Sequence, residues 1–209
     1  PNNPTGTFLN SSDIFLLIKK YSDKFFIVDE SFIDFSNSLS VSDIEGSDFL
    51  DNFLIIRSMS KSHGFPGVRL GYVYSNNINF VNRIKKSLPV WNFNSFAEYF
   101  LEIMLKYRNE FNNSIERTIH DRKLFVEKMR NQDWVIKVFE SEADFVLVQT
   151  SDNILNLVDV LLNNDSIYIR DVSTKFNDNK TYFRFAIRTH HENNLMINSI
   201  NKYLNKENV

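Results

Sequence analysis

The pattern that most constrains the fold is a set of short, uninterrupted apolar runs in the first half of the chain. The runs Lys24–Asp29, Phe53–Arg57 and Leu70–Tyr74 have the length of strands and show no polar alternation. Such strands are typical of α/β proteins, in which helices cover both faces of a largely parallel sheet. Amphipathic segments at Ser12–Ser22 and Ile78–Ser87 predict helices of that layer.

The second half follows a different pattern after a long helical stretch. That stretch runs from Ser95 to Arg130, and we expect it to bend near Asn112 and Asn113. Short strands and helices then predict a small α+β module. The expected elements are strands Val135–Phe139, Asp144–Gln149, Ser166–Arg170 and Thr181–Arg188, and helices Ile154–Asn163 and Glu192–Leu204. We therefore expect two parts, residues 1–112 and residues 113–209.

Composition excludes several classes of protein. The 209 residues carry a net charge of −2 with scattered basic residues, which does not indicate a nucleic-acid or anionic-membrane partner. There is no cysteine, so disulfides and thiolate metal sites are excluded, and no His, Asp or Glu spacing indicates another metal site. Nothing resembles a signal peptide or a membrane span. We expect a cytoplasmic enzyme that acts on small molecules.

Glycine and proline concentrate in two short segments. The chain has five glycines, and four of them lie in Pro1–Gly6 or Arg57–Tyr72, together with three of the four prolines. A chain this sparing with glycine is expected to use it where the backbone needs a positive φ or a close approach. Asp29 and Ser58 follow buried strands, at the edge where α/β sheets bind ligands. These segments are therefore the candidate site.

Three motifs in these segments carry a resemblance to a known family. Arg57–Tyr72 (RSMSKSHGFPGVRLGY) resembles the cofactor-lysine motif of the class I/II, fold-type I pyridoxal-phosphate enzymes. Asn3–Gly6 and Asp29–Glu30 resemble the other two signatures of that family, in the same order. The resemblance covers essentially the whole chain and is strongest to histidinol-phosphate aminotransferases and threonine-phosphate decarboxylases. It implies part of a large cofactor-binding domain, with a mostly parallel sheet, followed by a small α+β domain.

The resemblance assigns roles to the residues of these motifs. Lys61 would bind pyridoxal 5′-phosphate as an imine and, once substrate displaces it, would move a proton at the substrate α-carbon. Asp29 would pair with the pyridine nitrogen, and Asn3 would donate to the phenolic oxygen of the ring. The expected phosphate ligands, which combine hydroxyl donors with a guanidinium, are Ser58, Ser60 and Arg69.

The resemblance also implies substrate contacts. Arg184 matches the arginine that grips the substrate α-carboxylate, and Asn94 matches a segment that lines the site in related enzymes. Arg188 stands where histidinol-phosphate aminotransferases usually have glycine. It could bind a second anion of the substrate or a surface carboxylate. His63 is expected to pack within its loop rather than to take part in catalysis.

Phe32 is a second departure from the family pattern. Many aminotransferases have a tyrosine three residues after the aspartate, and its hydroxyl also reaches the phenolic oxygen. With one donor fewer, the imine is expected to hold its proton more tightly. Phe32 and Arg188 both favour similarity to threonine-phosphate decarboxylase.

The expected function is transfer of an amino group between an amino acid, plain or phosphorylated, and a 2-oxo acid. Decarboxylation is the alternative, because the same residues support it when the carboxylate is aligned with the ring. An alternative of another class is a non-catalytic, pyridoxal-phosphate-binding regulatory or remnant module. Family members have further chain before the Asn-Pro-Thr-Gly turn, so we expect a C-terminal fragment of an enzyme that is a homodimer in its full-length form.

Overall fold

The computed structural model describes residues 1–151 and 156–207, which form two compact units. The first unit consists of Pro1 and Leu9–Ile115. The second unit consists of Asn2–Phe8 and the chain from Glu116 onward. Residues 1–112 were expected to belong to one part, and the structure differs at Asn2–Phe8, which packs with the second unit.

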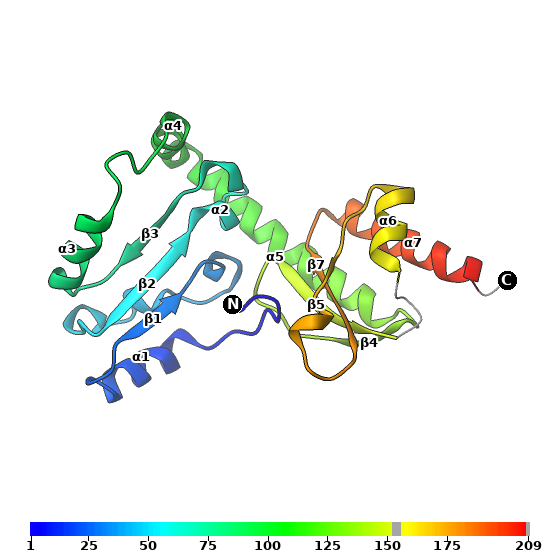
Figure 1. Ribbon diagram of the computed structural model, residues 1–209, viewed down its shortest axis with the longest axis horizontal. Helices are drawn as coiled ribbons and strands as arrows, with labels where there is room; N and C mark the ends of the chain where they lie inside the picture. Colours follow the sequence, from blue (N-terminus) through cyan, green and yellow to red (C-terminus); the bar gives the residue numbers. More distant parts are fainter. Residues whose placement is uncertain (152–155, 208–209) are drawn as a thin grey trace. The chain divides into compact units, whose positions relative to one another are not determined.

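The first unit contains a three-stranded sheet of β1 (Phe26–Asp29), β2 (Phe53–Ser58) and β3 (Gly71–Tyr74), in that order (Figure 1). β1 and β2 are parallel, as expected, but β3 is antiparallel to β2. The connection from β2 to β3, residues 59–70, is at the lower limit for a parallel crossover and holds only short helical turns, Met59–Ser62 and Pro66–Val68, in place of the helix that usually forms one. The two parallel strands therefore end at the same edge of the sheet.

Four helices precede the long helix of this unit. They are α1 (Ser11–Lys20), α2 (Met59–Ser62), α3 (Ile78–Ser87) and α4 (Ser95–Met104). Asparagine side chains fix three of the starts, since Asn10, Asn77 and Asn94 each accept a hydrogen bond from a backbone amide in the first turn.

One face of this sheet is packed against α1, and the other is only partly covered, with Leu54 buried and Ile56 more exposed. Ile18 of α1 is buried against Phe53 and Ile55 of β2. Side chains of a strand alternate between the two faces, and Ile56 lies on the face opposite Ile55. Ile56 is partly exposed, and Ile27 of β1 is exposed. The core of the first unit thus lies on the α1 side of the sheet.

The bend expected at Asn112 and Asn113 is wrong. α5 (Arg108–Arg130) is continuous through both residues, and the break falls at a 3₁₀ turn, Leu105–Tyr107, between α4 and α5. Both asparagines are exposed. Their amides can face water there instead of competing with the backbone of the helix.

The second unit contains an antiparallel sheet in the order β4-β5-β7-β6. Its strands are β4 (Val135–Val138), β5 (Phe145–Thr150), β6 (Arg170–Asp171) and β7 (Thr181–Ala186), and its later helices are α6 (Leu157–Asp165) and α7 (His190–Glu207). A single large core joins α5, α6 and α7 to β5 and β7. It includes Phe125, Met129, Val146, Val148, Leu161, Phe183, Phe185, Ile197 and Ile200.

One expected strand of this unit differs from the structure. The strand Ser166–Arg170 is reduced to its last residue plus Asp171. Ser166 has a left-handed backbone (φ 56°) that ends α6, and Ile169 is buried without a place in the ladder. The expected helix start at Ile154 lies outside the described residues.

The turn at the start of the chain is fixed by backbone contacts. Gly6 N–H donates to Asn2 O (2.7 Å), and Glu142 N–H donates to Gly6 O (2.9 Å). Gly6 has φ 72°, and a Cβ there would lie 2.2 Å from Ser141 Oγ. Only glycine fits this position, because both the backbone angle and the space exclude a side chain.

No helix in the described part of the chain has the length and apolar character that crossing a membrane requires.

Candidate active site

The carboxyl ends of the two parallel strands bring Asp29 and Ser58 to one edge of the first sheet. Asp29 is paired in register with Ile56, two residues before Ser58. Asp29 is exposed, and its carboxylate accepts a hydrogen bond from Ser31 N–H (2.9 Å). Asp29 and Ser58 are therefore the last residues of β1 and β2, at the edge of the sheet where they were expected.

Lys61 lies in α2, the single helical turn that follows β2. Met59 N–H donates to Leu70 O (3.1 Å) and His63 N–H donates to Met59 O (3.2 Å), which fixes this turn. The Lys61 side chain is exposed, and its Nζ lies 5.6 Å from the centroid of the Phe32 ring. Within residues 1–151 and 156–207 this amine has no hydrogen bond or ion pair. No side chain of the described residues therefore holds the Lys61 nitrogen in place.

The expected phosphate ligands lie in the same connection between β2 and β3. Ser58 is half-buried and Ser60 is buried, with a long Oγ contact to Leu70 O (3.4 Å). Arg69 has a left-handed backbone (φ 58°), and its Nη1 donates to Pro66 O (3.0 Å). A left-handed arginine costs about 1 kcal/mol or more and persists where its surroundings hold it.

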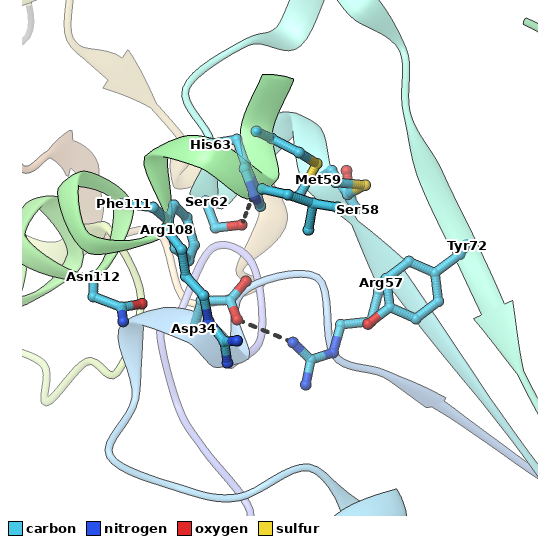
Figure 2. Close-up of a pocket in the computed structure, with 12 residues that line it drawn as sticks. Asp34, Arg57, Ser58, Met59, Ser62, His63, Tyr72, Arg108, Phe111 and Asn112 are labelled. Atoms are coloured by element: carbon cyan, nitrogen blue, oxygen red, sulfur yellow. Dashed lines mark hydrogen bonds and ion pairs between the residues drawn. The ribbon is translucent and has the colours of Figure 1, made fainter. Parts of the chain in front are cut away.

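An ionic cluster that the sequence analysis missed lies behind these strand ends. Glu30 is buried and accepts hydrogen bonds from Ser40 Oγ (2.7 Å), Val41 N–H (2.9 Å) and Arg57 Nε (3.1 Å). Arg57 also donates from Nη1 to Asp34 (3.0 Å), as Figure 2 shows. The signal in the sequence was a charged residue at the end of each of two apolar runs.

A cavity of about 310 Å³ lies next to this cluster, lined by Arg57, Ser58, Tyr72 and His63 among others (Figure 2). The His63 ring stacks on Phe111 with a centroid distance of 4.2 Å. Its Nδ1 lies 3.1 Å from Ser62 Oγ. Burial lowers the pKa of His63 below its ordinary value of 6.5, and Asp34 opposes this shift. These contacts are those of a packed ring.

Asn94 has a structural contact instead of an open side chain. Its amide oxygen accepts a hydrogen bond from Ala97 N–H (2.9 Å) and caps α4. No contact between described residues joins Asn94 to Lys61. The expected role of Asn94 beside the substrate therefore stays a prediction.

In the second unit the structure brings two expected site residues together. Arg184 of β7 donates from Nη1 to Asn3 Oδ1 (2.8 Å). The Arg184 guanidinium lies 5.0 Å from the centroid of the Phe145 ring, and its Nε is buried without a hydrogen-bond partner. Burial lowers the pKa of Arg184, as does the charge of Arg170. A buried donor without a partner costs free energy unless a ligand satisfies it.

Arg170 is a further residue that the sequence analysis missed. It is paired in register with Arg184 across β6 and β7. It is exposed, and no ion pair of the described residues neutralises it. Two adjacent guanidinium groups repel one another, which favours an anion between or beside them.

Arg188 does not join this pair in any recorded contact. Its Nη2 and Nε donate to Glu192 Oε1 at 2.8 and 3.3 Å. Thr189 Oγ1 donates to the other oxygen (2.7 Å), and these bonds lower the pKa of Glu192 to about 2. Of the two roles left open for Arg188, the surface carboxylate is the one that its contacts show.

These groups fit pyridoxal phosphate on physical grounds. The first unit offers an unpaired amine at Lys61, an exposed carboxylate at Asp29, and hydroxyls with a guanidinium in the Ser58–Arg69 connection. The second unit offers an unsatisfied guanidinium donor at Arg184. Among the described residues, no group of three or more His, Asp or Glu could hold a metal ion.

Comparison with known proteins agrees with a pyridoxal-phosphate site. Histidinol-phosphate aminotransferase of Buchnera aphidicola is 31% identical over 215 residues, covering 99% of this chain and 58% of the relative. The crystal structure of histidinol-phosphate aminotransferase from Clostridium acetobutylicum has a TM-score of 0.87 at 31% identity, covering 99% of this chain and 62% of that one. For L-threonine-O-3-phosphate decarboxylase from Porphyromonas gingivalis the TM-score is 0.85 at 25% identity, with 98% and 62% covered.

The chain thus spans less than two thirds of each of these relatives. The structural similarity confirms the expected fold class, and the expected cofactor, pyridoxal 5′-phosphate, agrees with the family. The sequence model described as "Aminotransferase class I and II" matches residues 1–200. The chain belongs to the class I and II aminotransferase family.

Proposed function

We propose that the protein containing this chain is a pyridoxal-phosphate-dependent aminotransferase. It would move an amino group between an amino acid and a 2-oxo acid. The observation that carries this proposal is the Lys61 amine, which has no hydrogen bond or ion pair among the described residues. Lys61 lies in the helical turn that follows β2. β2 ends at Ser58 and is paired with β1, which ends at Asp29.

The first unit would hold the cofactor. When bound, pyridoxal phosphate supplies an aldehyde that condenses with amines and a ring that accepts the electrons of the bond broken at the substrate. Lys61 would bind the aldehyde carbon, and the Asp29 carboxylate would keep the ring nitrogen protonated. Arg69, with the Ser58 and Ser60 hydroxyls, would bind the phosphate, for which a guanidinium fork and short donors are suited.

Lys61 has the properties of a group that carries a proton. Its side chain is long and exposed, and its Nζ contacts the face of an apolar ring, Phe32, instead of a carboxylate. An amine held this way is able to reach the substrate α-carbon and move a proton there, because no carboxylate of the described residues holds it in another position. Asn3 would donate from its amide nitrogen to the ring oxygen, while its Oδ1 accepts from Arg184.

The second unit would bind the substrate carboxylate. Arg184 Nε is buried without a partner, and a carboxylate oxygen would satisfy it. Arg170 offers a second guanidinium next to Arg184. We therefore favour a substrate with a second anionic group, such as a phosphorylated amino acid. The contacts of Arg188 with Glu192 do not support a role for Arg188 in binding that group.

Decarboxylation is the second candidate reaction. The similarity to the Porphyromonas gingivalis decarboxylase and the phenylalanine at position 32 favour it. The two reactions differ in the substrate bond that is held perpendicular to the ring, and Arg184 would set that orientation through the carboxylate. A regulatory or remnant module would bind cofactor without turnover. A homodimer and a cytoplasmic location stay predictions from the resemblance.

The reaction is tested by incubating the full-length protein with pyridoxal phosphate and a panel of plain and phosphorylated amino acids. Release of 2-oxo acid supports aminotransfer, and release of carbon dioxide supports decarboxylation. Cofactor binding without either product supports the non-catalytic alternative. Absence of cofactor binding would contradict all three.

The substrate class is tested with Arg170→Ala and Arg188→Ala in the same protein. Because Arg170 lies beside Arg184, Arg170→Ala is expected to raise KM for phosphorylated substrates by about tenfold to a hundredfold, the loss of a charge-assisted contact of about 1.5–3 kcal/mol. Arg188→Ala is the matched control and should leave KM unchanged. Equal effects of the two variants would rule out the assignment of Arg170.

A further inference from the structure

The cluster of Glu30, Arg57 and Asp34 joins three separate segments directly behind the proposed cofactor residues. Glu30 follows β1, Arg57 lies near the end of β2, and Asp34 belongs to the 3₁₀ turn Ile33–Phe35. Arg57 is the common member, since its Nε donates to Glu30 and its Nη1 to Asp34. The side chains are 3%, 19% and 26% exposed for Glu30, Arg57 and Asp34.

The geometry of the cluster requires an arginine. A lysine carries the same charge, but its three donors sit on one nitrogen, so it lacks the two separated, coplanar nitrogens with which Arg57 reaches Glu30 and Asp34. Glu30 is nearly fully buried, and loss of Arg57 would leave its charge uncompensated. Ser40 Oγ and Val41 N–H would remain as its partners. The cluster is therefore sensitive to any change at Arg57.

Each residue of the cluster adjoins a residue of the proposed site. Glu30 is next to Asp29 in the chain, and its N–H extends the β1–β2 pairing by donating to Ile56 O (2.9 Å). Arg57 precedes Ser58, which leads into α2 and Lys61. The turn that carries Asp34 follows Phe32, whose ring contacts the Lys61 amine.

We propose that Arg57 is a positioning residue, which holds Asp29, Phe32 and the Lys61 turn in one arrangement by linking Glu30 to Asp34. This inference rests on the proposed function for its purpose, since the arrangement matters for binding pyridoxal phosphate. Arg57 itself acts through these neighbours. A misplacement of about 1 Å at a reacting group is enough to lower activity on the order of a hundredfold.

The test uses the full-length protein with Arg57→Lys and Arg57→Ala. The control is Arg122→Lys, because Arg122 is also buried and bonded to a carboxylate, Glu142 (2.8 Å), but lies in the second unit. The first readout is hydrogen exchange of the Met59 and His63 amides without cofactor. These amides bond to Leu70 O and Met59 O and so report on the Lys61 turn. The second readout is the affinity for pyridoxal phosphate, with the pH titration of the bound cofactor's absorbance.

Both Arg57 variants are expected to exchange these amides about tenfold faster and to bind pyridoxal phosphate about tenfold more weakly. The absorbance titration should also shift in pH. Arg122→Lys should change none of these. Arg57→Lys keeps the charge and the volume, so it remains informative if Arg57→Ala does not fold.

Unchanged exchange at Met59 and His63 in Arg57→Lys, or an equal change in the Arg122 control, would overturn the proposal. If the wild-type protein binds no pyridoxal phosphate, the proposed function fails, while the exchange result still decides whether Arg57 positions the Lys61 turn.

Discussion

The two units hold their proposed functional residues in different ways. In the second unit Arg184 lies within β7, between β5 and β6, and the neighbouring Phe183 and Phe185 belong to the large core. In the first unit Lys61 and Arg69 lie in the connection between β2 and β3, and the core clusters of that unit are small. The proposed substrate anchor lies on a strand of a sheet, and the proposed cofactor residues Lys61 and Arg69 lie on a loop that a scaffold positions.

The difference shows where each unit departs from ordinary folding rules. The second unit has a buried donor without a partner at Arg184. The first unit has a non-glycine residue in the left-handed region at Arg69. Both departures fall on residues with a proposed ligand, but the second unit has others that do not: Thr150 Oγ1 is also buried without a partner among the described residues, and Ser166 and Asn179 are also left-handed.

The largest expected effect tests the difference in core packing between the two units. Phe183 is 1% exposed, so Phe183→Ala in the 209-residue chain should lower the free energy of unfolding of the second unit by about 3–5 kcal/mol. Ile27 is 64% exposed on the sheet of the first unit, and Ile27→Ala is the control, with an expected loss within about 0.5 kcal/mol. Chemical denaturation followed by tryptophan fluorescence measures both. Equal losses would break the comparison.

The sequence predicts most strands of the second unit and the strand ends of the first unit, because both depend on local pattern. Helix Ile78–Ser87 is observed with the predicted bounds, since Asn77 caps it and Leu88, followed by proline, ends it. Asp29 ends its strand as predicted, and Ser58, expected directly after its strand, is the last residue of β2.

What the sequence does not predict depends on distant contacts. The link from Arg57 to Glu30 and Asp34 spans more than twenty residues of chain, and either carboxylate alone is typical of a solvated strand end. Arg170 becomes a neighbour of Arg184 only through strand pairing. The strand expected at Ser166–Arg170 is wrong because apolar residues can be buried without joining a ladder.

A smaller expected effect is the pH dependence of stability that His63 causes in the loop of the first unit. Burial lowers the pKa of His63 in the folded state, so the unfolded chain takes up the proton first. The contribution of neutral His63 to the stability of the wild type is therefore fully present above pH 6.5. It is lost as pH drops below that value through the folded-state pKa. His63→Phe can keep the stacking on Phe111 and should remove this loss, a difference below about 1 kcal/mol after solvent screening.

Urea midpoints at pH 7.5 and at about pH 5 measure this effect. His120→Gln, at an exposed position of α5, is the control and should keep the wild-type pH dependence. A His63→Phe protein that loses as much stability on acidification as the wild type would show that His63 is not the cause.

The smallest expected effect lies at the start of α7 in the second unit. Thr189 and Arg188 lower the pKa of Glu192 from 4.5 to about 2. The carboxylate therefore contributes stability above pH 4.5, and that contribution is lost as pH falls toward 2. Because Glu192 is solvent-accessible, Glu192→Gln should cost about 0.5–1 kcal/mol near pH 7. The difference from the wild type should shrink below pH 4.5.

Nuclear magnetic resonance titration of the Glu192 carboxyl, with urea unfolding of both proteins, checks this prediction. Glu127→Gln, on the exposed side of α5, is the control and should leave stability unchanged near pH 7. An ordinary carboxyl titration for Glu192 would contradict the assigned contacts.

The central claim is that Lys61 is the residue that binds pyridoxal phosphate covalently. The most direct measurement is borohydride reduction of the full-length protein in the presence of pyridoxal phosphate, followed by peptide mass spectrometry. The expected result is a stable cofactor adduct on Lys61, absent from Lys61→Ala, with an exposed lysine such as Lys19 unmodified at equal cofactor concentration. An adduct on another lysine, or no adduct, would contradict the claim.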